Sequence, residues 1–201
     1  AGGDAAAVVI PLPAPRRLDA DPRAALAVIA RRRSERRYSA RPLPAQALAD
    51  VLHALSAPPA QLSTALRIDV LTPGVHGLEA AAWRHAGGGR LRRRVAHGPA
   101  LRARARAAAL DQDVIGEAAA VFVLSLDRAA LAADPHGPAR GYRHGFLEAG
   151  LAGERLYLAA GALGLAACGV GAFHDDEAAA LVGIDPAREW VVHFAALGVR
   201  A

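Results

Sequence analysis

The sequence predicts a single α+β domain, and three observations support this prediction. The run 66–71 alternates apolar and polar residues, which is typical of a half-buried strand. Two longer apolar runs, 118–126 and 190–197, predict fully buried strands. Between them, 145–163 predicts the longest helix, so helices and strands occur in mixed order. A length of 201 residues suits one domain over 1–201, because the chain contains no internal repeat and no linker that would mark a second one.

The first part of the chain predicts an extended arm followed by two helices. The arm covers 1–20 and is apolar and rich in proline toward its middle. The first helix begins near Asp21, continues into 31–38 and is expected to stop before Pro42. A second amphipathic helix follows Pro44.

Shorter patterns predict the remaining elements. Trp83 lies on a second short strand before a three-glycine turn, and 99–110 predicts an arginine-rich helix. The long helix at 145–163 is apolar over much of its circumference, which predicts a central position in the fold. A last short helix ends at 182–183, and the polar segment 174–176 can cap its start.

The composition limits the class of protein. Hydrophobic residues make up 53% of the chain and charged residues 21%, which excludes a disordered or collagen-like protein. All 24 basic residues are arginine, and against 19 acidic residues they give a net charge of +5. We attribute the absence of lysine to a GC-rich genome rather than to function. Any site that needs a cation must therefore use arginine, and no lysine can serve as a base or Schiff-base nucleophile.

Cysteine, histidine and hydropathy patterns exclude further classes. Cys168 is the single cysteine, so an internal disulfide and a multi-cysteine zinc site are excluded, and its apolar neighbours predict a buried, inert thiol. The eight histidines show no metal-ligand spacing, so no metal site is expected. No run of about 18 apolar residues could span a bilayer. The segment 1–7 lacks the charged start of a signal peptide, so a cytoplasmic protein is expected.

Two segments concentrate arginine. Segment 32–38 places several guanidinium groups and one hydroxyl at a predicted helix end, and arginine forks bind phosphate bidentately. An anion site and a solvated helix end explain this segment equally well. Segment 90–106 holds seven arginines but no aromatic side chain for base stacking. A solvated face, or a surface for an acidic peptide, is therefore favoured over nucleic acid as its role.

Several motifs resemble one enzyme family. Arg-Arg-Ser-x-Arg-x-Tyr at 32–38, followed by Ser-Ala-Arg-Pro-Leu-Pro and an amphipathic helix, resembles the opening motif of the nitroreductase superfamily of flavin enzymes. Further motifs resemble its SagB-type branch: Leu-Glu-Ala-Gly at 147–150, Leu-Tyr-Leu-Ala-Ala at 156–160 and Cys-Gly-Val-Gly-Ala-Phe at 168–173. That branch contains dehydrogenases that oxidise thiazolines and oxazolines in peptides to azoles. The resemblance covers 8–55 and 110–200, whereas 57–109 matches poorly.

The resemblance implies a nitroreductase-like fold with a central mixed or antiparallel sheet flanked by helices. It also implies a homodimer with two FMN molecules at the subunit interface. The FMN-binding residues that it implies are Arg32, Arg33, Ser34, Arg36, Val170, Gly171, Ala172 and Arg200. The first three would contact the phosphate, the ribityl chain and the pyrimidine edge, with Arg36 beside them. The residues at 170–172 would line the isoalloxazine ring, where a Cβ on the glycine would obstruct close approach. Arg200 is either a further phosphate contact or a charged chain end.

The proton-transfer groups depart from the SagB-type pattern. That branch often has a Lys-Tyr pair shortly before an Arg-Gly-Tyr-Arg segment, which stands at 140–143 here. The positions of the pair fall on about His136 and Gly137. His136 is either a base, since histidine titrates near neutral pH, or an exposed loop residue. His136 and Tyr142 are the candidates for the catalytic proton-transfer group.

Three functions are compatible with these residues. The first is an FMN-dependent dehydrogenase of a peptide azoline or related heterocycle in natural-product biosynthesis, acting on a peptide or small heterocyclic substrate with or without a biosynthetic partner protein. The second is an NAD(P)H-dependent reductase of nitro compounds, quinones or enones. The third is a non-catalytic binding or scaffold subunit that kept the fold. The Arg-Arg-Ser motif favours an enzyme, whereas the missing Lys-Tyr pair favours the third function.

Overall fold

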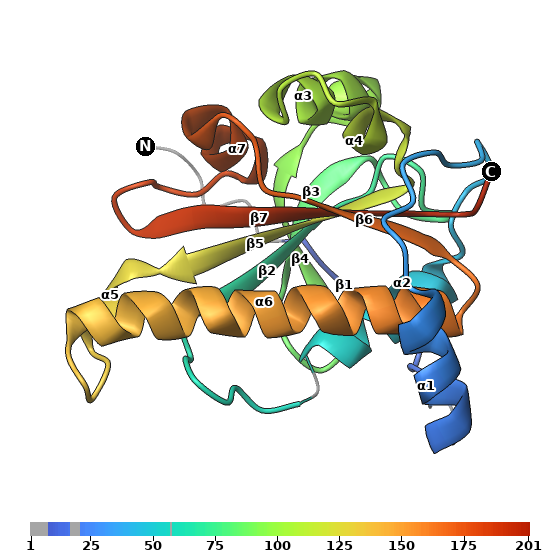
Figure 1. The fold of residues 1–201 in the computed structure, drawn as a ribbon. Coiled ribbons are helices and arrows are strands. Elements are labelled where there is room, and N and C mark those ends of the chain that lie inside the picture. The colour runs from blue at the N-terminus through green and yellow to red at the C-terminus, as the bar shows by residue number, and fades with distance from the viewer. Residues whose placement is uncertain (1–7, 17–20, 57) are drawn as a thin grey trace.

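A computed structural model describes residues 8–16, 21–56 and 58–201, and these form three layers (Figure 1). The middle layer is one antiparallel sheet with the strand order β1-β4-β3-β2-β5-β7-β6 in this part of the chain. The strands are β1 (Val9–Pro11), β2 (Leu66–Leu71), β3 (Ala81–His85), β4 (Arg90–Ala96), β5 (Ala120–Asp127), β6 (Ala166–Val170) and β7 (Glu189–Gly198).

Helices cover both faces of the sheet. The helices are α1 (Pro22–Arg31), α2 (Ala45–Ser56), α3 (Leu101–Ala108), α4 (Asp113–Glu117), α5 (Arg128–Ala132), α6 (Pro138–Ala162) and α7 (Asp175–Val182). Helices α2 and α6 pack on one face, with α1 and α5 beside opposite ends of α6, and α3, α4 and α7 cover the other face (Figure 1). The α+β fold with a helix-flanked sheet is confirmed, and the sheet is antiparallel rather than mixed.

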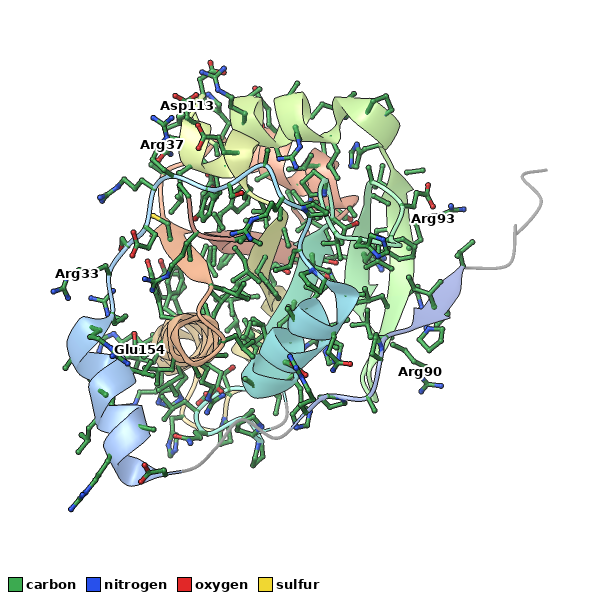
Figure 2. The ribbon with its side chains drawn as sticks, turned by 90° about the vertical axis from the view of Figure 1, so that its right-hand side faces the viewer. Arg33, Arg37, Arg90, Arg93, Asp113 and Glu154 are labelled. Carbon is green, nitrogen blue, oxygen red and sulfur yellow. The ribbon has the colours of Figure 1, made fainter. Side chains whose placement is uncertain are left out.

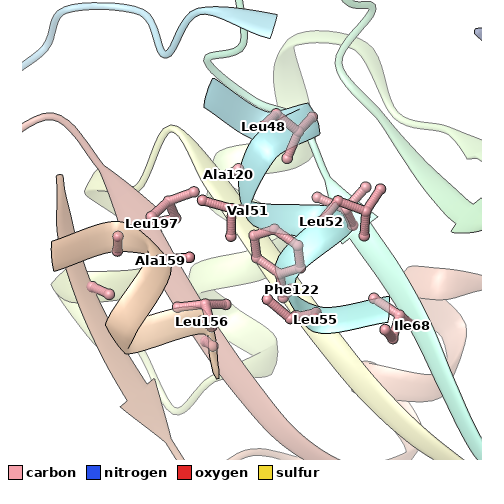
Figure 3. Packing of buried hydrophobic residues seen from close by; sticks show 14 of the residues in the cluster. Leu48, Val51, Leu52, Leu55, Ile68, Ala120, Phe122, Leu156, Ala159 and Leu197 are labelled. Carbon is pink, nitrogen blue, oxygen red and sulfur yellow. The ribbon is translucent and has the colours of Figure 1, made fainter. Parts of the chain in front are cut away.

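A buried apolar layer lies on each side of the sheet. On the α2–α6 side, Phe122 of β5 is fully buried beneath Leu52 and Leu55 of α2 and Leu156 of α6 (Figure 3). Burying a side chain of this size contributes about 1.5–3 kcal/mol. On the opposite side, Phe194 of β7 belongs to the layer that α3 and α7 close. The predicted central helix is therefore confirmed as a core element.

The first helix is shorter than predicted. It ends at Arg31, and Arg32 to Tyr38 form an extended segment instead of a helix end. The reason is tertiary: the backbone N–H of Glu35 donates to the carbonyl oxygen of Ala167 at 2.9 Å, so this segment runs beside the edge strand β6. The interpretation of 32–38 as a helix end was wrong.

Three strands were missing from the predictions: β4, β6 and, within the expected arm, β1. β4 lies in the segment that was grouped with α3 as arginine-rich, and Leu91 is its one fully buried residue. β6 lies in the apolar run around Cys168, whose burial is confirmed. The long helix also begins earlier than predicted, because Pro138 occupies the first turn, where proline is tolerated.

The short helix α7 begins and ends as predicted, but its start is stabilised differently. His174 precedes it and makes no capping bond with its side chain. Asp175 and Asp176 lie in the first turn, where the helix dipole favours negative charge. Gly183 ends the helix with φ +66°, a conformation that glycine adopts readily.

The expected arm is described only in part. Its residues 8–16 include β1, which pairs with β4 at the opposite edge of the sheet from β6. Segments 1–7 and 17–20, including the start that was compared with a signal peptide, lie outside the described residues. Among the helices that the structure describes, none combines the length and the apolar character needed to cross a membrane.

Candidate functional site

Two pockets lie on either side of β6, and together they contain most of the predicted cofactor residues. The first, called here the basic pocket, has a volume of about 40 Å³. Its polar lining residues are Arg31, Arg32, Arg33, Glu35, Tyr157 and Arg200. The second, called here the β6 pocket, has a volume of about 390 Å³. It is lined by Arg36, Gln112, Asp113, Val114 and the segment 168–172.

Backbone bonds hold the segment 32–39 against the end of the sheet. Besides the bond from Glu35 to Ala167, the N–H of Ser39 donates to the carbonyl oxygen of Val199 at 2.9 Å. Tyr38 forms an antiparallel bridge with Arg200. This pairing brings Arg200 to the same pocket as Arg32 and Arg33, although the chain separates them by more than 160 residues.

The basic pocket has an excess of positive charge. Four guanidinium groups line it, and Glu35 is the one carboxylate among its lining residues. The contact between Arg200 and Glu35 is long, at 3.9 Å. Arg33 donates to the carbonyl oxygen of Arg32 at 2.9 Å, and its side chain extends away from the fold beside the end of α1 (Figure 2). Such a donor set favours an anion with several oxygens, such as a phosphate.

The β6 pocket presents open backbone beside Val170 and Ala172. The amide of Gln112 donates to the carbonyl oxygens of Ala109 and Ala172 at 2.9 and 3.0 Å, which fixes this loop against the end of α3. A Cβ built on Gly171 would meet no atom within 4 Å, so the space in front of this backbone is empty of protein atoms. A flat ring could therefore approach the chain closely at this point.

Cys168 lines the β6 pocket, and its thiol is inert in character. Burial raises the pKa of its thiol, and the charge of Arg36 opposes that rise without cancelling it. A thiol with a raised pKa is a poor nucleophile at neutral pH.

Tyr157 of α6 joins the two pockets, and sequence reasoning did not select it. Its hydroxyl lies 2.9 Å from Ser34 Oγ and accepts the N–H of Gly169 at 2.6 Å. The guanidinium of Arg32 lies 5.1 Å from the centre of its ring. One signal was present in the sequence, because Tyr157 is the only polar side chain in the motif 156–160.

The two catalytic candidates lie at the other end of α6. His136 is exposed in the α5–α6 loop, with its ring 6.1 Å from that of His144. Tyr142 is 48% exposed and packs on Phe146 at 4.7 Å between ring centres. Tyr142 precedes Tyr157 by fifteen residues, which corresponds to about 22 Å along a helix. Within one chain, neither candidate lines the basic pocket or the β6 pocket.

Metal binding has no support from the described geometry. In residues 8–16, 21–56 and 58–201, no three His, Cys, Asp or Glu side chains are grouped so that they could hold a metal ion.

Comparison with known protein families shows which class of protein has this fold. The profile of the nitroreductase family matches residues 29–199, so the chain belongs to the nitroreductase family. A comparison with curated proteins finds no match.

Three solved structures are similar to this chain. One from Anabaena variabilis, described as a nitroreductase, has 25% sequence identity and a TM-score of 0.84 over 97% of this chain. This chain spans only 42% of the Anabaena protein. A nitroreductase from Ralstonia eutropha has 21% identity and a TM-score of 0.78, with 96% of this chain and 90% of that one covered. A nitroreductase from Desulfovibrio desulfuricans, solved in complex with FMN, has 23% identity and a TM-score of 0.65, with 91% and 88% covered. The last two likenesses concern the fold.

Proposed function

We propose that this protein is an FMN-dependent oxidoreductase, and that the basic pocket and the β6 pocket bind two ends of one flavin. The observation that supports this most strongly is the pairing of an arginine-rich anion pocket with open glycine backbone across a single edge strand. Family membership and the FMN complex of the Desulfovibrio relative support the same cofactor.

The residues present fit FMN chemically. The phosphate would be held by Arg32, Arg33 and Arg200, because these three arginines line one pocket that contains a single carboxylate. Ser34 would add a hydroxyl between the pockets, and Arg36 a cation at the β6 pocket. The backbone at 170–172 would lie against the ring. When bound, the flavin supplies two-electron redox chemistry by accepting or giving a hydride.

We infer that the protein acts as a homodimer. His136 and Tyr142 can serve the site only if a second copy supplies them, because in one chain they lie at the far end of α6. An antiparallel pairing of two α6 helices would bring the Tyr142 end of one copy to the Tyr157 end of the other. Phe146 and Leu147 of α6 are 41% and 57% exposed, so apolar surface is available for such pairing. A monomer at micromolar concentration in sedimentation velocity would contradict this assembly.

The proposed reaction is the dehydrogenation of a peptide azoline or related heterocycle, as the resemblance to the SagB-type branch suggests. In that reaction His136 or Tyr142 removes a proton from the substrate. The competing proposal is an NAD(P)H-dependent reductase of nitro compounds, quinones or enones. The chain contains no lysine, so the Lys-Tyr pair usual in the SagB-type branch is missing, and this favours the reductase. A non-catalytic subunit is the third possibility, and the lack of that pair supports it as well.

Flavin binding is the first test. The purified protein, or the protein mixed with FMN and desalted, is expected to be yellow and to bind FMN more tightly than riboflavin. Riboflavin is the matched control because it lacks only the phosphate. A preparation that stays colourless with added FMN contradicts both enzyme proposals, and equal affinity for the two flavins contradicts the phosphate role of the basic pocket.

The direction of electron flow is the second test. Anaerobic mixing of the FMN-loaded protein with NADPH is expected to leave the visible flavin absorbance unchanged if the protein is a dehydrogenase. Rapid bleaching identifies the reductase instead. Stopped-flow absorbance at the flavin maximum gives the rate directly.

A further inference from the structure

Tyr157 projects from α6 into the gap between β6 and the extended segment 32–38. Its hydroxyl has two partners among the described residues: the Gly169 N–H at 2.6 Å and Ser34 Oγ at 2.9 Å. Gly169 belongs to an edge strand, so its outward N–H has no neighbouring strand to bond with. Tyr157 therefore satisfies a backbone donor and contacts a predicted flavin residue with the same oxygen.

The direction of the bond between Gly169 and Tyr157 follows from counting protons. A backbone N–H can only donate, so Tyr157 Oη accepts from Gly169. The phenol has one proton of its own, and in the described part of the chain the acceptor within hydrogen-bond distance is Ser34 Oγ. Either hydroxyl can donate in the bond between Tyr157 and Ser34; when Tyr157 donates, the bonds run from Gly169 to Tyr157 and from Tyr157 to Ser34.

This direction determines what Ser34 can do. Since its oxygen accepts the proton of Tyr157, its own proton must be directed to another group. Among the described residues, the geometric hydrogen-bond partner of Ser34 Oγ is Tyr157 Oη. An oxygen or nitrogen atom of a bound ligand could therefore accept the Ser34 proton. Ser34 is thereby prepared as a donor toward the space between the two pockets.

We propose that Tyr157 is a positioning residue for the flavin: through the bond chain Gly169–Tyr157–Ser34, it fixes the Ser34 hydroxyl as a hydrogen-bond donor to FMN. Its ring also holds the guanidinium of Arg32 at 5.1 Å. This inference rests on the proposed flavin function and adds a specific role for one residue of α6. Its hydroxyl acts on FMN through Ser34, while its ring lines the basic pocket.

The test is a double-mutant cycle on FMN affinity, measured by quenching of flavin fluorescence. Tyr157→Phe keeps the ring beside Arg32 and removes only the hydroxyl. It is expected to weaken FMN binding about tenfold, as is Ser34→Ala. If Tyr157 acts through Ser34, the double variant Tyr157→Phe/Ser34→Ala binds no more weakly than Ser34→Ala alone. Independent effects would instead multiply to about 100-fold, and that result overturns the inference.

Tyr38→Phe is the matched control. It makes the same chemical change at a buried hydroxyl close to β6, but the Tyr38 hydroxyl has no hydrogen-bond partner among the described residues. Its FMN affinity is expected to equal that of the wild type. A tenfold loss in Tyr38→Phe would show that any buried tyrosine hydroxyl here affects binding, and it would overturn the specific role of Tyr157.

The outcomes separate this inference from the proposed function. If the wild type binds FMN and Tyr157→Phe binds it equally well, the bond chain is wrong and the flavin function stands. If the wild type binds no FMN, both are wrong. Should Tyr157→Phe fail to fold, hydrogen exchange in the wild type still tests the geometry: the Gly169 amide is expected to exchange slowly, and fast exchange overturns the bond to Tyr157.

Discussion

Two segments of this protein are rich in arginine, but the groups that surround their side chains differ. The first cluster is Arg31, Arg32, Arg33, Arg36 and Arg37, and the second is Arg90, Arg92, Arg93, Arg94, Arg102, Arg104 and Arg106. Figure 2 shows Arg33 and Arg37 on one flank of the molecule and Arg90 and Arg93 on the other. From residue spacing alone, an anion site and a solvated helix end explained the first cluster equally well, and a solvated face or a surface for an acidic peptide was favoured for the second.

Most of the second cluster is bonded to protein. Arg93 pairs with Glu79 at 2.8 Å, and Arg94 donates to the carbonyl oxygen of Gly183 at 2.6 Å. Arg102 donates to the carbonyl oxygens of Gly116 and Ala118, and Arg106 pairs with Asp111 and Asp113 at 3.0 Å each. These arginines attach β4 and α3 to neighbouring loops.

The first cluster has fewer protein partners. Within the described residues, Arg37 forms its one ion pair, with Glu117 at 3.5 Å. Arg32 and Arg33 contact an aromatic ring and a neighbouring carbonyl oxygen instead of carboxylates. The comparison teaches that local pairing, and not the number of arginines, distinguishes a ligand site from a structural one. Several uncompensated guanidinium groups in one place are unfavourable unless an anion joins them.

The largest expected effect is on ligand binding by the first cluster. Arg32→Ala/Arg33→Ala is expected to weaken FMN binding by at least about 100-fold, because two charge-assisted contacts are lost. The matched control is Arg90→Ala/Arg92→Ala, which removes the same charge from the second cluster. Flavin fluorescence titration measures both. Equal losses in the two variants would mean that net charge alone governs affinity, and the comparison would fail.

A second prediction concerns stability in the second cluster. Arg102→Met removes two donors and leaves the carbonyl oxygens of Gly116 and Ala118 without them, so unfolding is expected to require about 1–3 kcal/mol less free energy. Arg104→Met is the control, since Arg104 is exposed, and it is expected to change stability by less than about 0.5 kcal/mol. Urea unfolding followed by circular dichroism measures both. FMN affinity of folded Arg102→Met should equal that of the wild type, and a large loss would link this arginine to the ligand site.

The fold was largely predictable because its central elements have strong local patterns. The strand at 118–126 is a continuous apolar segment, the long helix after it is apolar over much of its circumference, and both are present with shifted ends. β4 was missed because three consecutive arginines at 92–94 interrupt the alternation expected of a strand. In the structure its pairing with β3 shifts register between Ala82 and Trp83, which allows this interruption.

The site was predictable only where its residues adjoin in sequence. The motif 32–34 could be selected from its guanidinium groups alone. Tyr157 bonds to Ser34 across 123 residues, and no local sequence pattern indicates that contact. The distance of His136 and Tyr142 from the pockets could not be predicted either. It depends on the length and direction of α6, which the spacing of residues in the motifs does not report.

The smallest expected effect concerns Arg16, which lies outside both arginine clusters and pairs with a buried carboxylate. Arg16 donates to Asp50 from its side chain at 2.7 and 2.9 Å and from its backbone N–H at 2.8 Å. Burial raises the pKa of Asp50, but these donors and the amide of Gln46 outweigh it and hold the pKa below its usual value. A lowered folded-state pKa means that the pair stabilises the protein above about pH 4 and loses this contribution as the pH falls further.

Asp50→Asn should therefore be less stable than the wild type by about 1 kcal/mol at pH 7, since Arg16 is largely exposed and solvent weakens the pair. The difference should shrink as the pH falls below about 4 and through the lowered pKa of Asp50, where the carboxyl of the folded wild type becomes protonated. Urea unfolding at several pH values measures it. No such pH dependence is expected between the wild type and Arg33→Ala, because Arg33 has no carboxylate partner among the described residues. A difference that stays constant with pH in Asp50→Asn would mean that packing, and not the charge of the carboxylate, joins Arg16 to α2. The contrast between arginines that pair with carboxylates and arginines proposed to bind an anion would then not apply to Arg16.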